Sequence, residues 1–160
     1  MQSRFSILTL VLLGLLLGVM KSPGEEQVSE DNSFTTEFLV EKGELASTGR
    51  NPFFNLEPVN QLTYEDDDER LVITVLNETK IVDGVETRVI EERETKGGKL
   101  VEVSRNFFAI SKRTNSVFYF GEEVDIYKNG KVVAHEGAWM SGEKGAKFGL
   151  MMPGDRKSVV

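Results

Sequence analysis

The sequence predicts a mainly β protein, an antiparallel meander of hairpins that forms a curved sheet, a half-barrel or a sandwich. Between residues 51 and 154, β-branched and aromatic runs alternate at short intervals with turn pairs. The pair Asn129-Gly130 lies between alternating apolar residues and is typical of a two-residue hairpin turn. No window from 51 to 160 keeps the i, i+3, i+4, i+7 apolar spacing of an amphipathic helix.

The first expected strands lie in the middle of the chain. Residues 70–76 place apolar side chains on both faces of a strand, which predicts a strand buried on both sides. Asp83-Gly84 can adopt the positive φ of a tight turn before a strand at 85–95, whose charged second half should emerge into solvent. Gly97-Gly98 makes the next turn, before a strand at 100–110.

The later strands are shorter. Residues 117–120 predict a short aromatic strand, and residues 125–128 should pair with 131–134 through the Asn129-Gly130 turn. Glycines recur through residues 137–149, around the single tryptophan of the chain. This spacing predicts an irregular loop, either a functional loop or a demanding crossover between two halves of a sheet.

Residues 1–24 predict an N-terminal signal helix. A basic start precedes the apolar run Phe5–Met20, which is typical of an export signal. As a helix, the apolar run Phe5–Met20 would span roughly 24 Å, which is shorter than the ~30 Å hydrocarbon core of a bilayer. Ser22 and Gly24 suit cleavage before Glu25, although an uncleaved anchor stays open because no A-x-A site is present. We therefore expect an exported protein, periplasmic or extracellular.

The rest of the chain divides by composition. Residues 25–50 predict a polar linker, with a possible short edge strand at Phe38–Val40. Residues 51–154 predict the β domain, and residues 155–160 look like a terminal extension or a truncation point.

Composition excludes several classes of function. The formal charge is −7, and removal of residues 1–24 would take away two basic residues and leave a charge near −9. This balance repels nucleic acid and anionic lipid, so we expect no nucleic-acid partner and membrane contact only through an uncleaved N-terminal segment. The chain has no cysteine, which excludes disulfides and thiolate metal sites. We expect no cofactor.

Two stretches of the chain match known catalytic motifs only in part. His135-Glu136 lacks the second histidine of H-E-x-x-H, because position 139 is tryptophan. Ser141 and Lys144 match S-x-x-K, but the glycines at 142 and 145 oppose the helix that this motif requires. We predict no catalytic residue, and a solvated His135 at the end of its strand.

The preferred hypothesis is a non-catalytic binding or structural module of the cell envelope or extracellular space. Its partner would be a small molecule, a lipid or an envelope component. The candidate ligand-binding residues are Phe118, Phe120, Glu122 and Trp139, whose aromatic members either fill the core or line an apolar pocket. Two alternatives stay open. One is a carbohydrate-active or other hydrolase that uses the carboxylates at 122–125.

The other alternative is a calcium-stabilised adhesion module. The run Glu65–Glu69 gathers hard oxygen ligands, and Asp66 and Asp68 are the candidate metal ligands. The glycine and the distal glutamate of an EF-hand loop are missing, and the same charges could protect the entrance of a strand.

Six short motifs of the chain carry a resemblance to known proteins: Asn51-Pro-Phe-Phe-Asn-Leu-Glu-Pro58, Leu62-Thr-Tyr64, Val117-Phe-Tyr-Phe-Gly-Glu122, Gly137-Ala-Trp139, Gly145-Ala-Lys-Phe-Gly149 and Met152-Pro153. With these motifs the chain resembles a family of uncharacterised exported bacterial β-proteins, many of which carry signal peptides or lipid anchors. The resemblance covers about residues 50–154 and implies an antiparallel β domain, with no catalytic residues to carry over. Similar proteins usually continue past the Met-Pro element with further strands.

Overall fold

A computed structural model describes residues 40–154 of the protein, so the predicted signal helix at 1–24, Phe38 and residues 155–160 lie outside the described part. Within it the chain is mainly β, with one short 3₁₀ helix and no α-helix. The elements are η1 (Lys42–Glu44), β1 (Leu45–Ala46), β2 (Arg50–Asn51), β3 (Phe54–Asn55), β4 (Gln61–Asp66), β5 (Glu69–Val82), β6 (Val85–Lys96), β7 (Lys99–Ser111), β8 (Val117–Lys128), β9 (Lys131–Ala134), β10 (Trp139–Met140) and β11 (Gly149–Met152).

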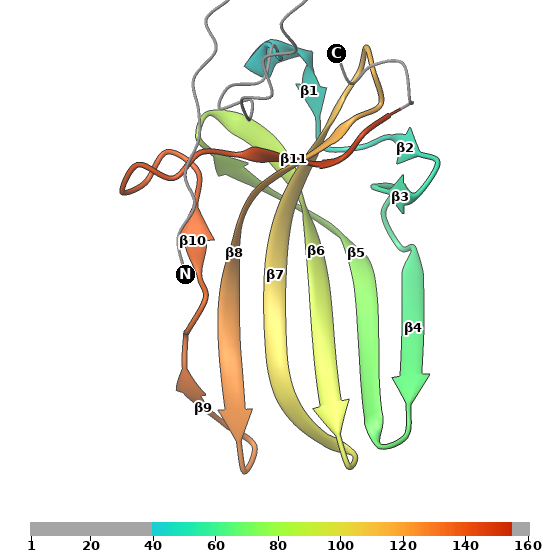
Figure 1. Ribbon diagram of the computed structural model, residues 1–160, viewed down its shortest axis with the longest axis vertical. Helices are drawn as coiled ribbons and strands as arrows, with labels where there is room; N and C mark the ends of the chain where they lie inside the picture. The colour runs from blue at the N-terminus through green and yellow to red at the C-terminus, as the bar shows by residue number, and fades with distance from the viewer. Residues whose placement is uncertain (1–39, 155–160) are drawn as a thin grey trace, which may run out of the picture. The chain divides into compact units, whose positions relative to one another are not determined.

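The strands form one open antiparallel sheet of nine strands, with a separate two-stranded ladder of β2 and β3 (Figure 1). The central order is β10-β8-β7-β6-β5-β4, so consecutive strands from β4 to β8 are neighbours, as a meander requires. β1 pairs with β7, and both β9 and β11 pair with β8. The mainly β class and the antiparallel sheet are therefore confirmed.

The three predicted two-residue turns lie where the sequence places them. Asp83-Gly84, Gly97-Gly98 and Asn129-Gly130 join β5 to β6, β6 to β7 and β8 to β9. Both residues of each pair have positive φ, the conformation that glycine, asparagine and aspartate tolerate best.

Two predictions about the strands are wrong. Residues 70–76 of β5 are not buried on both faces, because only Val75 is buried and most of the others are half-buried. The aromatic run at 117–120 and the segment at 125–128 are parts of one strand, β8, and the carboxylates between them do not form a turn. The strand continues through a β-bulge at Gly121, where the register between β7 and β8 shifts and the glycine has a φ of 136°. The predicted irregular loop at 137–149 also contributes β10 and the first residue of β11 to the sheet.

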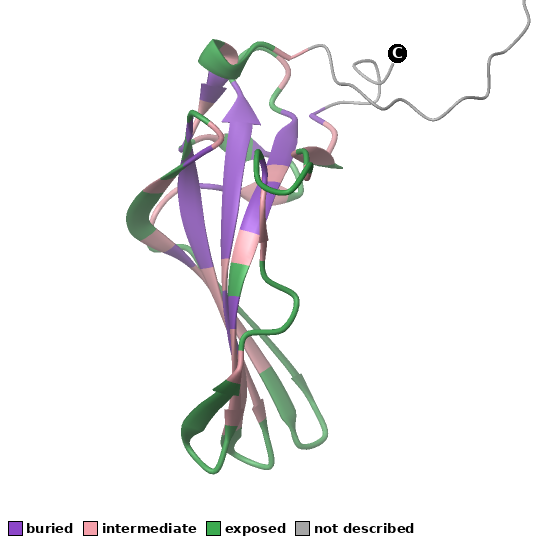
Figure 2. Ribbon diagram, turned by 90° about the vertical axis from the view of Figure 1, so that its left-hand side faces the viewer, coloured by how far each residue is buried: buried purple, intermediate pink, exposed green. Residues whose placement is uncertain are grey.

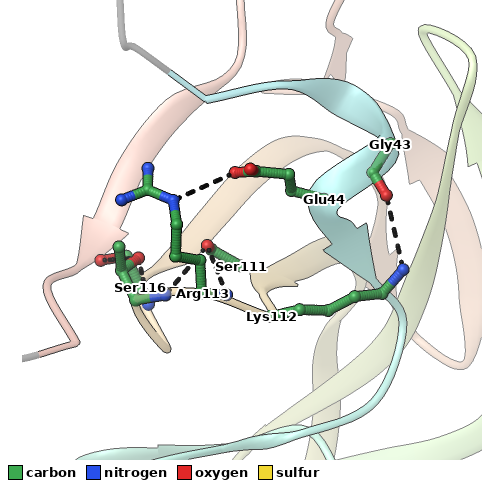
Figure 3. Close-up of polar contacts among 7 residues, drawn as sticks. Gly43, Glu44, Ser111, Lys112, Arg113 and Ser116 are labelled. Carbon is green, nitrogen blue, oxygen red and sulfur yellow. Dashed lines mark hydrogen bonds and ion pairs between the residues drawn. The ribbon is translucent and has the colours of Figure 1, made fainter.

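The described fold begins before the predicted start of the β domain at Asn51. Leu45 of β1 is buried in the core and pairs with Ser111 of β7. Figure 3 shows how this segment is held: the ammonium of Lys112 donates to the carbonyl of Gly43, and Arg113 pairs with Glu44. Residues 40–50 of the predicted linker thus contribute structure to the domain.

The core has two layers, one on each face of the sheet. Adjacent residues along a strand point to opposite faces, and Val89 and Ile90 accordingly fall into different apolar clusters, as do Phe107 and Phe108. Figure 2 shows that the buried residues gather in one half of the sheet. The other half, which carries the turns at 67–68, 97–98 and 129–130, is covered by no second layer from the described chain.

We call this second region, residues 61–74, 91–105 and 122–134, the open half of the sheet. Its residues are mostly exposed or half-buried. Because no second layer from the described residues covers the open half, the side chains on its two faces determine what it can bind.

Candidate binding face

Strand alternation divides the open half into two faces of different chemistry. Starting from Ile90 in the core, every second residue of β6 places Glu92 and Glu94 on the same face. The cross-strand register adds Glu102 of β7 and Glu122 of β8, opposite Glu94 and Asn106 respectively. We call this side the glutamate face.

On the opposite side of the open half, carboxylates pair with lysine and arginine side chains. We call this side the ion-pair face. Lys80 pairs with Glu123 and also lies 4.6 Å from the centre of the Phe107 ring. Two further ion pairs join residues on the same side, Arg93 with Glu91 and Arg105 with Glu78. On this side too, His135 Nδ1 lies 2.8 Å from the Asp125 carboxylate. Within residues 40–154, no lysine, arginine or histidine forms such a pair with any of the four carboxylates of the glutamate face.

Neighbouring carboxylates raise the pKa values of Glu92 and Glu102. Burial, followed by repulsion from Glu122 and Glu102, raises the pKa of Glu92 above its ordinary value. Burial and the charges of Glu94 and Glu122 raise the pKa of Glu102 in the same way. Glu92 and Glu102 are therefore costly to ionise, and a cation on this face would remove part of that cost.

An aromatic and amide group completes one side of the face. Trp139 of β10 lies opposite Glu122 of β8, and its ring meets the Tyr119 ring edge-on, with centroids 5.3 Å apart. The Tyr119 hydroxyl donates to Asn106 Oδ1 at 2.6 Å, and Asn106 donates in turn to Ser104 Oγ at 3.1 Å. Burial and the charge of Glu122 raise the pKa of Tyr119, so its hydroxyl stays protonated.

Apolar side chains flank the carboxylates on both sides. On the β4 side, alternation and register place four of them together: Leu62, Tyr64, Leu71 and Ile73. Leu62 and Tyr64 are 56% and 57% exposed. On the β8 side, Val124 and Ile126 follow Glu122 on the same face. The glutamate face is thus a band of negative charge between two apolar margins.

The face is shallow. A small hollow of about 20 Å³ is lined by Leu71, Glu92, Glu94, Glu102 and Ser104. This volume is about enough for a single water molecule. A ligand would therefore lie across the face and would not enter a cavity there.

The structure separates the four predicted ligand-binding residues into two pairs. Phe118 and Phe120 are buried in the core, where Phe120 is fully buried and stacks on Phe148 with ring centroids 4.7 Å apart. They fill the core, one of the two roles that the sequence left open for them. Glu122 and Trp139 lie directly opposite each other on the glutamate face.

The predicted metal ligands Asp66 and Asp68 lie at the tight turn between β4 and β5. Among residues 40–154, no three carboxylates or histidines come close enough together to hold a metal ion. Cationic side chains pair with the two glutamates that flank this turn: Arg70 with Glu65 at 3.0 Å, and Lys96 with Glu69 at 2.6 Å. The calcium alternative thus lacks a complete ligand set in the described part.

Among the carboxylates of the hydrolase alternative, Glu122 lies on one face of the sheet, and Glu123 and Asp125 share the other. Glu122 belongs to the glutamate face, whereas Glu123 and Asp125 point to the ion-pair face and pair with Lys80 and His135. Two carboxylates on opposite faces of a sheet cannot flank one glycosidic bond. His135 is largely exposed at the end of β9, and its Nδ1 lies 2.8 Å from Asp125.

The hydroxyl of Ser141 bonds to Asp83 and not to Lys144, the lysine of the S-x-x-K pattern. Its hydroxyl donates to Asp83 at 3.0 Å and accepts from the Phe148 amide. Lys42 reaches the same carboxylate at 2.6 Å. This arrangement fastens the glycine-rich loop and the N-terminal segment to the turn between β5 and β6.

Sequence reasoning missed Glu92, Glu94, Glu102 and Tyr119 as members of the candidate site. A signal was present, because Glu92 and Glu94 alternate with Arg93 along a predicted strand. The sequence gives no register between β6, β7 and β8, and only the register brings the carboxylates together.

Comparison of the chain with family models, with curated proteins and with solved structures found no match. In residues 40–154, no helix is both long enough and apolar enough to cross a membrane.

Proposed function

We propose that this chain is an exported, non-catalytic β-domain that acts as a binding module of the cell envelope or extracellular space, and that its ligand lies across the glutamate face. One observation carries the proposal. Glu92, Glu94, Glu102 and Glu122 of the glutamate face form no ion pair within residues 40–154, whereas Glu91 and Glu123 of the ion-pair face pair with Arg93 and Lys80. The ion pair on the glutamate side of the sheet, between Lys96 and Glu69, lies beside the turns.

The ligand that fits this face carries positive charge and apolar groups. Four neighbouring carboxylates favour a cation, which would relieve the repulsion that helps to raise the pKa values of Glu92 and Glu102. The apolar margins favour a ligand with aliphatic or aromatic groups on either side of its charge. Trp139 and Tyr119 present aromatic rings beside Glu122, a setting that also attracts cations.

Trp139 makes the proposal directly measurable, because it is the single tryptophan of the chain and lies at the edge of the face. We would titrate the protein with a short peptide of alternating lysine and leucine and follow tryptophan emission. A peptide of the same length with glutamate in place of lysine is the control. We expect a saturable change with the lysine peptide alone, weakened as salt concentration rises.

Two adjacent residues provide matched variants. Glu122→Gln removes a charge from the glutamate face, and Glu123→Gln removes the same charge from the ion-pair face, one residue further along β8. We expect Glu122→Gln to weaken binding several-fold and Glu123→Gln to leave it unchanged. Equal effects of the two variants, or equal binding of the glutamate peptide, would contradict the proposal.

Export has its own test. The full chain, expressed in a bacterial host with its N-terminal segment intact, should be recovered from the periplasm or the medium. Mass spectrometry should then find an N-terminus at Glu25 if the proposed cleavage occurs. Recovery of the uncleaved chain from the cytoplasm would contradict export without bearing on the binding face.

A further inference from the structure

We infer that two copies of this chain associate edge to edge through β4, in antiparallel register about a two-fold axis at Thr63. β4 ends the strand order of the open sheet, and its outer edge is paired with no other strand of residues 40–154 (Figure 1). All six of its residues are exposed. The inference does not depend on the proposed ligand.

The edge lacks most of the features that keep sheet edges apart. Folded proteins protect such edges with proline, lysine, bulges or very short strands. Gln61–Asp66 contains neither proline nor lysine, and it pairs with β5 over six consecutive positions without a register shift. Its acidic residues are confined to the end next to the turn. The backbone groups of this edge therefore favour an added strand.

The sequence of β4 selects a second copy as that strand. When two identical strands pair antiparallel, the numbers of any two residues that lie opposite each other add up to the same value. A two-fold axis at Thr63 therefore places Leu62 of each copy opposite Tyr64 of the other. An aliphatic residue opposite an aromatic one is a favourable cross-strand pair. Both side chains belong to the glutamate face and are more than half exposed, so pairing removes apolar surface from water.

The same register keeps like charges apart. Glu65 falls opposite Gln61 of the second copy, whose amide can donate to a carboxylate. The two Glu65 residues are then four positions apart along the strands, roughly 13 Å, which exceeds the ~8 Å screening length at physiological salt. An axis at Tyr64 would instead place Leu62 opposite Asp66, an apolar side chain against a charge.

Cysteine cross-linking tests the register. The chain has no cysteine, so any disulfide between protein thiols in a single-cysteine variant must join two copies. At the predicted axis the two copies of residue 63 lie directly opposite each other, with Cα atoms about 4.5–5.5 Å apart, within disulfide range. We would oxidise the full chain bearing Thr63→Cys in a non-ionic detergent and measure the cross-linked dimer on a denaturing gel. Glu65→Cys, in the same strand, is the matched control.

We expect at least a ten-fold faster disulfide formation by Thr63→Cys than by Glu65→Cys. Adding Leu62→Lys to Thr63→Cys should slow it to the control rate, with the circular dichroism of the single variant retained. A double variant Gln61→Cys/Glu65→Cys should cross-link as readily as Thr63→Cys. Equal rates for Thr63→Cys and Glu65→Cys, or no effect of Leu62→Lys on a folded protein, would overturn the inference.

Discussion

Glu94 of β6 and Glu102 of β7 lie directly opposite each other across two neighbouring strands of the glutamate face. Like charges at such a position oppose sheet formation. The protein therefore carries a local electrostatic cost in the half of the sheet that no second layer of residues 40–154 covers. Binding of a positive charge would reduce this cost, which connects the stability of the fold to the proposed function.

Replacement of Glu102 by glutamine should stabilise the protein at neutral pH. Burial and neighbouring carboxylates raise the pKa of Glu102 in the folded state. Ionisation consequently costs the folded protein more than the unfolded one, and this cost is present above the raised pKa and absent below the ordinary value. We expect a gain of about 0.2–1 kcal/mol in the free energy of unfolding at pH 7, disappearing below about pH 4.

Urea denaturation at several pH values measures this difference. Glu91→Gln is the matched control, because Glu91 lies on the opposite face and pairs with Arg93 at 3.6 Å. It should give no gain at any pH. A destabilised Glu102→Gln at pH 7 would mean that the carboxylate has a partner that this account lacks.

Phe120→Ala should destabilise the protein strongly. Phe120 is fully buried and stacks on Phe148, so truncation leaves a cavity in the core. Such substitutions cost about 3–5 kcal/mol. Thermal or urea unfolding measures the loss, and Phe53→Ala, at a residue that is 78% exposed, should change the stability by less than about 0.5 kcal/mol. A stable Phe120→Ala protein would return this residue to the candidates for ligand binding.

Gly121→Ala should move β10 away from β8. A Cβ atom at this position would lie 2.3 Å from the Trp139 carbonyl oxygen, and the φ of 136° disfavours any residue with a side chain. We expect a cost of about 1–3 kcal/mol and a red shift of Trp139 emission as the ring loses its place against Tyr119. Gly130→Ala meets only backbone strain, because no atom lies within 4 Å of its Cβ position. Its emission spectrum should match that of the unaltered protein.

Asp83→Asn should remove a contribution to stability that depends on pH. The hydrogen bond from Lys42 lowers the pKa of Asp83 below its ordinary value of 3.8, with a further contribution from Ser141. The ionised carboxylate therefore stabilises the fold above the ordinary pKa, and this stabilisation is lost as the pH falls through the lowered value. Asparagine keeps the positive φ of the turn. The variant should melt lower at pH 7 and equal the unaltered protein at about pH 2; an equal difference at both would contradict the role of the charge.

Much of the fold could be predicted from local sequence. Paired residues with positive φ defined three turns, and apolar alternation defined the strands around them. Gly121 was harder, because a glycine inside a strand and a glycine that ends one look alike in the sequence. Leu45 was missed because its burial depends on β7, more than sixty residues away.

The candidate site could be predicted only in part. Glu122 and Trp139 were candidates from composition, and their direct pairing adds the geometry. The contrast between the two faces follows from register and from ion pairs such as Lys80 with Glu123, which join residues far apart in the chain. The alternation of side chains along one strand assigns each residue to a face of the sheet. Only the folded sheet shows which carboxylates form ion pairs.

The central claim is that ligand binds to the glutamate face and not to the ion-pair face. Methyl-labelled NMR spectra recorded with the alternating lysine and leucine peptide test it most directly, because neighbouring residues report on opposite faces. We predict shifts for the methyl groups of Leu71, Ile73 and Ile126, and none for Val72 on the other side of β5. Shifts of Val72 equal to those of Leu71 and Ile73, or no shifts at a saturating peptide concentration, would contradict the account.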